Sequence, residues 1–261
     1  MKRILLAVLI AALSCPQVFG WGREGHETIA AIAEKNLKPS TKKIVEKYLD
    51  NHSIIYYAKW MDEVRRTPEY RESGEWHGVP VDENLYHMPD KNGKGDAVTA
   101  INAAVALLKD YKNLPDSTVA VNIKYLIHLV GDMHCPAHIY YKGRNQVFNV
   151  VFGDKYYIKP IQTIKFHSLW DYGVVQSSRI WSPVDYAEQL DRLSKKEIKA
   201  ITAGTPEEWL HENAVRCEVQ FDWAGPGDTV AQDFVNKALP LIEKQWQYAG
   251  YRLAHVLNSL F

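Results

Sequence analysis

The chain has 261 residues, and its 31 Lys and Arg against 31 Asp and Glu give a formal net charge of zero. This balance excludes a polybasic protein that coats nucleic acid, and it excludes an acidic disordered tail. Hydrophobic residues make up 46% of the chain and aromatic residues 11%, which is enough to build a full core and excludes disorder as the main state.

The first 20 residues have the pattern of a signal peptide. Positive charges at positions 2 and 3 precede an apolar run over residues 4–13, and small residues at 18 and 20 suit a cleavage site. We expect cleavage before Trp21, which removes two cations and no anion and leaves a mature domain over residues 21–261 with a net charge of −2. Cleavage before Cys15, as in a lipoprotein, is the less favoured alternative. The protein is therefore predicted to be exported, either to the periplasm or to the medium.

Residues 21–261 are predicted to form one all-α domain with a small β-hairpin. Apolar residues recur at helical spacing within residues 29–33, 101–108 and 123–130, and a last helix is expected over 228–260 with a break near Gly250. Helix starts are marked by Thr205, followed by Pro and by Glu at the third position, and by the capping candidates Asp96 and Asp116. Residues 146–158 alternate around a Gly-Asp-Lys turn and predict the hairpin. No apolar run after residue 20 is long enough to span a membrane.

Two His–Asp pairs predict a metal site. His128 and Asp132 are four apart on a helical segment, so their side chains project from one face, and His167 and Asp171 repeat the spacing. His138 follows the first pair just after Pro136, which ends or kinks the helix. Imidazole and carboxylate are ligands of zinc, whereas one such pair alone is more often a surface hydrogen bond.

Three further segments carry candidate ligands. His26 lies five residues after the expected new N-terminus, Asp62 stands three residues before Arg65, and His87 lies in a short segment that ends at Asp90. Separately, each is more often a helix cap, an ion pair or a half-buried histidine. The remaining histidines are interpreted as ordinary, and they are His52, His77, His134, His211 and His255.

Together these segments resemble one family over nearly the whole mature chain. The residues occur in the order Trp21, His26, Asp62, His87, then HLVGDMHCPAH at 128–138 and HSLWD at 167–171. This pattern is similar to the zinc-dependent single-strand-specific nucleases, the S1/P1 family. A turn at Gly143 and Asn145, followed by the strand at 149–152, also looks like that family's loop.

The resemblance implies a cluster of three zinc ions that cleaves phosphodiesters. Its expected ligands fall into three sets: Asp62, His87, His128 and Asp132; His26, Asp132 and the amine and carbonyl of Trp21; and His138, His167 and Asp171. An α-amine titrates near 8, so a metal can displace its proton. Two ions would activate a shared water and the third would stabilise the leaving 3′ oxygen, which gives 5′-phosphate products.

The predicted catalytic residues are Asp62 and Arg65. The guanidinium of Arg65 matches the family's phosphate clamp, with an ion pair to Glu63 or Glu69 as the alternative. Substrate contacts are expected from Met88, which stands where the family has a base-stacking aromatic, and from Asp90 and Asn145.

The predicted activity is an endonuclease and 3′-nucleotidase that acts on single-stranded DNA, RNA and 3′-nucleotides, with no obligate protein partner. Two alternatives remain. One is a zinc phospholipase C, which the short gap from Trp21 to His26 and an Asp at 171 disfavour. The other is an exported zinc-binding protein without turnover. Cys135 and Cys217 could pair once or stay free, and Cys135 is interpreted as a packing residue.

Overall fold

The fold is predominantly helical, as predicted. The computed structural model describes residues 21–89, 92–153, 161–179 and 181–261, so the expected signal peptide lies outside the described residues. In chain order the α-helices are α1 (Arg23–Lys35), α2 (Pro39–Tyr48), α3 (Trp60–Val64), α4 (Ala97–Leu108), α5 (Asp116–Asp132), α6 (Phe166–Ser168), α7 (Val174–Gln176), α8 (Pro183–Leu190), α9 (Lys195–Ile201), α10 (Pro206–Cys217), α11 (Gln220–Trp223) and α12 (Gln232–Leu260).

Shorter helical turns connect these elements. Turns of 3-10 type are η1 (Pro68–Glu75), η2 (Tyr111–Asn113) and η3 (Pro136–His138), and η4 (Leu169–Gly173) is a π-helical turn. None of the helices among the described residues is both long and apolar enough to cross a membrane.

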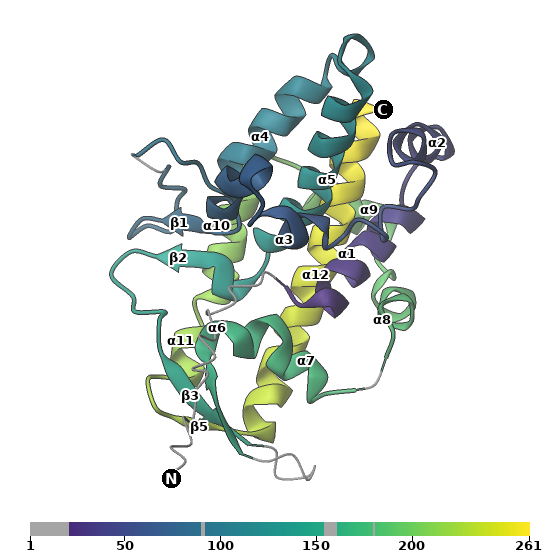
Figure 1. The fold of residues 1–261 in the computed structure, drawn as a ribbon. Helices are drawn as coiled ribbons and strands as arrows, with labels where there is room; N and C mark the ends of the chain where they lie inside the picture. Colours follow the sequence, from purple (N-terminus) through teal and green to yellow (C-terminus); the bar gives the residue numbers. More distant parts are fainter. Residues whose placement is uncertain (1–20, 90–91, 154–160, 180) are drawn as a thin grey trace, which may run out of the picture.

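The long helix α12 is the axis of the molecule, and α1 and α5 pack beside it (Figure 1). Gly250 permits the close approach of α12 to α1, because a Cβ at this position would lie 2.6 Å from Cβ of Ile32. The helix therefore continues through Gly250 and also through Pro240. The predicted break near Gly250 is wrong, since this glycine serves helix packing.

Two of the three predicted caps are confirmed. Thr205 forms a capping box with Glu208 at the start of α10, and the Asp96 side chain accepts a hydrogen bond from the Thr99 backbone N–H at the start of α4. Asp116 is not a cap: it lies in the first turn of α5, after Pro115. An acidic residue there still interacts favourably with the positive end of the helix dipole.

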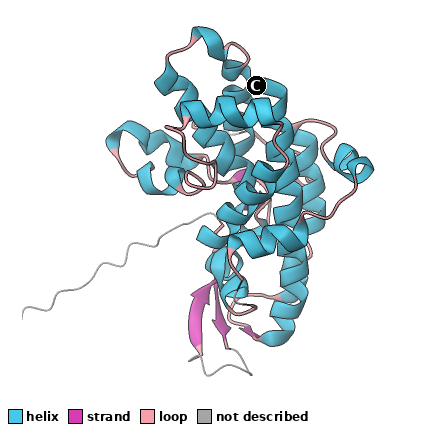
Figure 2. Cartoon of the chain, turned by 90° about the vertical axis from the view of Figure 1, so that its right-hand side faces the viewer, coloured by secondary structure: helices cyan, strands magenta, loops and turns pink. Residues whose placement is uncertain are grey.

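The strands among the described residues form two small sheets. β3 (Asn149–Phe152) pairs antiparallel with β4 (Gln162–Lys165), which confirms a hairpin but places its second strand beyond the predicted end. Figure 2 shows this sheet, which β5 (Thr229–Val230) completes in parallel with β3, at one end of the helical body. A second sheet, which the sequence did not predict, joins β1 (Val79–Val81) in parallel to β2 (Ile139–Tyr141).

Candidate metal centre

Five buried side chains from separate parts of the chain meet in the core. α1 supplies His26, α3 supplies Asp62, and α5 supplies both His128 and Asp132. The fifth is His77, which lies between η1 and β1. All five are at most 8% exposed, although each carries an ionisable group. Such a concentration of buried imidazole and carboxylate is costly unless the groups are paired or hold a metal.

Asp132 stands at the centre of this group. Its Oδ1 lies 3.3 Å from Nε2 of His26, and its Oδ2 lies 2.8 Å from Nδ1 of His77 and 3.2 Å from Nε2 of His128. The two carboxylate oxygens therefore face different imidazoles. This is the arrangement in which one carboxylate can bridge two neighbouring metal ions.

His128 is oriented by the backbone behind it. Its Nδ1 donates a hydrogen bond to the carbonyl of Ala58 over 2.8 Å, which leaves Nε2 facing Asp132. A second hydrogen bond of this kind fixes the tautomer and the ring orientation of metal-binding histidines. Burial disfavours the charged imidazolium, but the carboxylates of Asp132 and Asp62 outweigh burial and raise the pKa of His128 to about 9.

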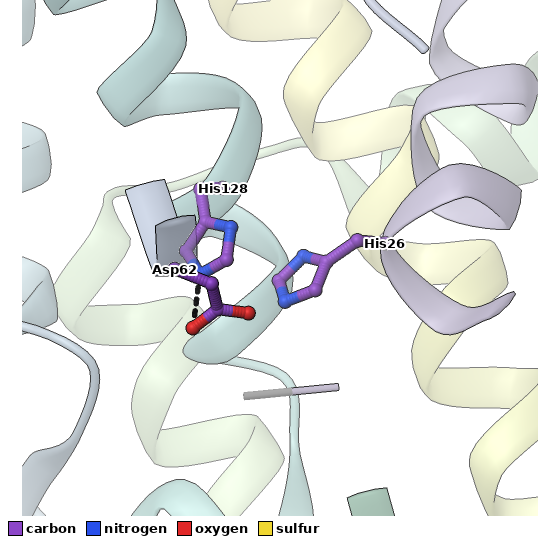
Figure 3. A group of neighbouring side chains, drawn as sticks. All are labelled: His26, Asp62 and His128. Carbon is purple, nitrogen blue, oxygen red and sulfur yellow. Dashed lines mark ion pairs between the residues drawn. The ribbon is translucent and has the colours of Figure 1, made fainter. Parts of the chain in front are cut away.

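Figure 3 shows His26, Asp62 and His128 pointing toward one another from three helices. The rings of His26 and His128 stack with centroids 3.9 Å apart, and Oδ1 of Asp62 lies 3.9 Å from Nε2 of His128. Within the described residues, several buried atoms here lack a hydrogen bond of good geometry: both ring nitrogens of His26, both oxygens of Asp62, Nε2 of His77 and Oδ1 of Asp132. Metal ions would supply the partners that these buried atoms lack.

A second group adjoins the first. Nε2 of His138 lies 3.0 Å from Nε2 of His167 and 3.8 Å from Oδ1 of Asp171, and His167 Nε2 lies 3.1 Å from Asp171 Oδ2. His167 and Asp171 stand on α6 and the π-helical turn η4 that follows it. Burial raises the pKa of Asp171 to about 7, with His167 opposing it, and burial lowers the pKa of His138 to about 4.

His138 links the second group to the first. Its Nδ1 donates to the backbone carbonyl of His77, and the same nitrogen lies 3.6 Å from Oδ1 of Asp132. Because Nδ1 carries this proton, the Nε2 lone pair faces His167 and Asp171. In the part of the chain that the structure describes, three triads have ligand atoms close enough for one ion: His26, Asp62 and His128; His77, His128 and Asp132; and Cys135, His138 and Asp171.

Cys135 is fully buried beside the second group. Its Sγ lies 3.7 Å from Oδ1 of Asp171, and burial raises the pKa of the thiol well above its ordinary value. Cys135 and Cys217 both remain unpaired in the described structure.

Trp21 lies against the same helix as the first group. Its indole Nε1 donates to the carbonyl of Gly131, the residue before Asp132, over 2.9 Å, and its ring packs edge-on against Trp246. The next backbone N–H, that of Gly22, donates to the carbonyl of Asp171 over 2.8 Å. The chain at residues 21–22 is thus tied to the two segments that supply Asp132 and Asp171.

The structure does not bring His87 to this centre. Its Nε2 contacts Oδ2 of Asp96 over 3.0 Å, in a turn that folds back onto β1 through a bridge between His87 and Val81. The prediction of His87 as a ligand is therefore corrected in favour of His77. The sequence offered no local sign of this, because His77 reaches the centre through the long-range pairing of β1 with β2.

The predicted substrate contacts change with this correction. Met88 was expected to follow a metal-binding histidine, but its backbone N–H bonds to the carbonyl of Pro80, and the residue after His77 is Gly78. Asp90 lies outside the described residues. Asn145 is exposed, and its side-chain oxygen accepts from the N–H of Val147 over 3.0 Å, which stabilises the loop before β3.

Arg65 lies beside the first group at the end of α3. The residue is 9% exposed, and its Nε is 3.8 Å from Oδ1 of Asp62. Arg65 therefore contacts Asp62, a partner that was not predicted, whereas the predicted alternative partners Glu63 and Glu69 are exposed.

Sequence comparison identifies relatives over nearly the whole chain. A sequence model of the S1/P1 nuclease family matches residues 21–261. The chain belongs to that family. It is similar to nuclease S1 of Aspergillus oryzae, with 24% identity over 98% of this chain and 97% of the relative. It is also similar to nuclease P1 of Penicillium citrinum, with 27% identity over 92% and 97% of the two chains, and to endonuclease 2 of Arabidopsis thaliana, with 23% identity over 95% and 93%.

Proposed function

We propose that this member of the S1/P1 nuclease family is an exported zinc enzyme that hydrolyses phosphodiester bonds in single-stranded DNA and RNA. It also removes the phosphate of 3′-nucleotides, and its products carry 5′ phosphates. The names of its relatives support nuclease chemistry. One observation supports metal-dependent chemistry most strongly: buried imidazoles and carboxylates converge on Asp132 with lone pairs left over.

The donor set fits zinc, which binds histidine nitrogen and carboxylate oxygen. Two ions would be held by the first group and the N-terminal backbone: His26, Asp62, His77, His128, Asp132 and the backbone of Trp21. The third ion would be held by His138, His167 and Asp171. When bound, zinc supplies Lewis acidity toward phosphoryl oxygens and makes water a nucleophile at neutral pH. The other contributions come from the residues of this chain.

Asp132 holds the two parts of the first group together, because its two oxygens face His26 on one side and His77 with His128 on the other. The backbone acceptors at Ala58 and His77 orient His128 and His138 so that the opposite nitrogens face inward. These hydrogen bonds keep the ligand atoms in place before substrate arrives, which lowers the cost of reorganisation.

Arg65 is placed to bind the phosphate that is cut. It stands beside the ligand Asp62 in a largely water-excluded position, and a planar guanidinium donates two parallel hydrogen bonds to phosphoryl oxygens. Its positive charge would offset the negative charge that develops in the transition state.

Export completes the site. A free amine at Trp21 exists only after cleavage of the expected signal peptide, and residue 21 already lies against Gly131 beside Asp132. The unprocessed precursor should therefore lack one ligand group, so the activity would appear only after export.

The test uses purified mature protein that begins at Trp21 and a circular single-stranded DNA, which only an endonuclease can open. We expect cleavage, its loss with a chelator, and its return with zinc. A matched duplex circle should be cut much more slowly. If the single-stranded circle survives while the protein holds zinc, the proposal is wrong. Hydrolysis of phosphatidylcholine would then support a phospholipase, and no hydrolysis of any ester would support zinc binding without turnover.

A further inference from the structure

The position directly after His77 has no side chain, and an aromatic ring from another strand fills its space. A Cβ added to Gly78 would overlap the outer edge of the Tyr140 ring, at its Cε2, Cζ and hydroxyl atoms. Gly78 is therefore needed for this ring position. The ring stands over the segment that supplies a candidate ligand of the first group.

Strand pairing explains how the ring reaches this place. β1 starts two residues after His77, β2 starts directly after His138, and the parallel register aligns Pro80 with Tyr140. Figure 1 shows the two strands side by side. Tyr140 thus lies on β2, which follows His138 of the second group, and it overlies β1, which follows His77 of the first group.

Tyr140 faces outward, unlike its neighbours on β2. Its side chain is 43% exposed, whereas Ile139 and Tyr141 are buried, and the Tyr141 hydroxyl donates to the carbonyl of Ala214. The ring is therefore a partly exposed surface on the strands that follow both groups.

A cavity opens on the side of Tyr140 that faces the second group. Its volume is about 390 Å³, which lies in the usual range for small-molecule sites. It is lined by the rings of Tyr140 and Phe148, by Lys165 and the candidate metal ligand His167, and by the polar side chains of Gln146, Asn149 and Ser168. Phe148 is fixed by stacking on Phe166, with ring centroids 4.5 Å apart.

We propose that Tyr140 is the stacking platform for the base of the nucleotide whose 3′ oxygen leaves during cleavage. This inference rests on the proposed function, because it places that nucleotide beside His138, His167 and Asp171. A flat ring stacks on any base, because every base has a π-face. Tyr140 is thereby a specificity-determining residue for single strands, whose bases are free to leave the helical stack.

The experiment compares two dinucleotide substrates. The first is intact, and the second is abasic in the nucleotide that carries the leaving 3′ oxygen. We expect Tyr140→Ala to lower kcat/KM for the intact dinucleotide about 10- to 100-fold and to leave the abasic substrate within about twofold of wild type. Tyr140→Phe, which retains the ring and removes only the hydroxyl, should stay close to wild type on both. Zinc content should be the same in all variants.

A control variant and a binding measurement complete the design. Tyr56→Ala removes a tyrosine that is 67% exposed and packs on His52, and it should leave both rates unchanged. A single-stranded oligonucleotide with 2-aminopurine at the cut and a non-hydrolysable linkage reports stacking through loss of fluorescence. Quenching by wild type and by Tyr140→Phe, but not by Tyr140→Ala, is expected.

Different failures have different meanings. Equal loss on intact and abasic substrates would overturn base stacking, and so would unchanged kinetics in Tyr140→Ala. A large loss in Tyr140→Phe would assign the effect to the hydroxyl and also overturn it. In each case cleavage by wild type would leave the proposed function standing. A wild-type protein that holds zinc and cuts neither DNA nor dinucleotides would overturn both.

Discussion

Two histidines that are close together in the sequence, His77 and His87, each contact an aspartate, but the surroundings of the two pairs differ. His77 contacts Asp132 over 2.8 Å, and His87 contacts Asp96 over 3.0 Å. Asp96 uses its other oxygen to cap α4, so both of its oxygens have partners within ordinary secondary structure. Asp132 instead meets four histidines, and its Oδ1 lacks a well-formed hydrogen bond in the described structure. The contact distance is nearly the same in both pairs, so the distinguishing signs of a metal centre are convergence and leftover lone pairs.

The largest expected difference in activity lies between variants of the two aspartates, Asp132 and Asp96. Asp132→Asn removes the charge that faces His26, His77 and His128 while the side-chain volume stays the same. Since metal-ion catalysis contributes several kcal/mol, we expect kcat/KM on single-stranded DNA to fall by at least about 1,000-fold. Asp96→Asn is the matched control and should change the rate less than about threefold. Comparable losses in the two variants would remove the distinction between the pairs.

An effect of intermediate size is expected in the free energy of unfolding of the metal-free protein, which should depend on pH through His128. The charged form of its imidazole is stabilised in the folded state, where its pKa is about 9 against an unfolded value near 6.5. This stabilisation is complete below pH 6.5 and is lost as pH rises to 9. Asp171, with a pKa of about 7, is mostly ionised above that pH, so His128 dominates between pH 7.5 and 9.

The measurement is urea unfolding with a chelator present. From pH 7.5 to 9 the free energy of unfolding of the metal-free protein should fall by about 1–2 kcal/mol, whereas zinc-loaded protein should change little because the metal has displaced the proton. His128→Gln should flatten the dependence. A rise in stability over this interval would contradict the charge arrangement around His128.

The smallest expected effect lies on the His87 side. Asp96→Ala removes the side-chain cap of α4 and should lower the free energy of unfolding by about 1 kcal/mol. Zinc content should not change, because Asp96 lies outside the triads that can hold an ion. A loss of zinc in this variant would extend the metal centre to His87.

Local sequence signals predicted much of the fold and part of the site. The capping box at Thr205 and the cap at Asp96 depend on residues three apart, so they could be identified directly. The pairs His128–Asp132 and His167–Asp171 could also be identified, because helical geometry brings residues four apart to one face. The structure places both pairs where this rule predicts.

The features that the sequence did not predict depend on contacts between distant segments. His77 reaches the centre because β1 pairs with β2, some 60 residues later in the chain, and strands of three residues give too short a pattern to predict. The role of Gly78 could not be predicted for the same reason, because it depends on the ring of Tyr140, which lies over this glycine. The continuous α12 likewise depends on α1, which packs where Gly250 has no side chain.

The measurement that tests the central claim most directly is the zinc content of His77→Ala and His87→Ala, prepared in parallel as mature protein with wild type as reference. If the buried convergence on Asp132 is the metal centre, His77→Ala should lose at least one of the zinc ions bound by wild type, and His87→Ala should retain all of them. Full zinc content in His77→Ala together with loss in His87→Ala would contradict the account and return the site to the His87 segment.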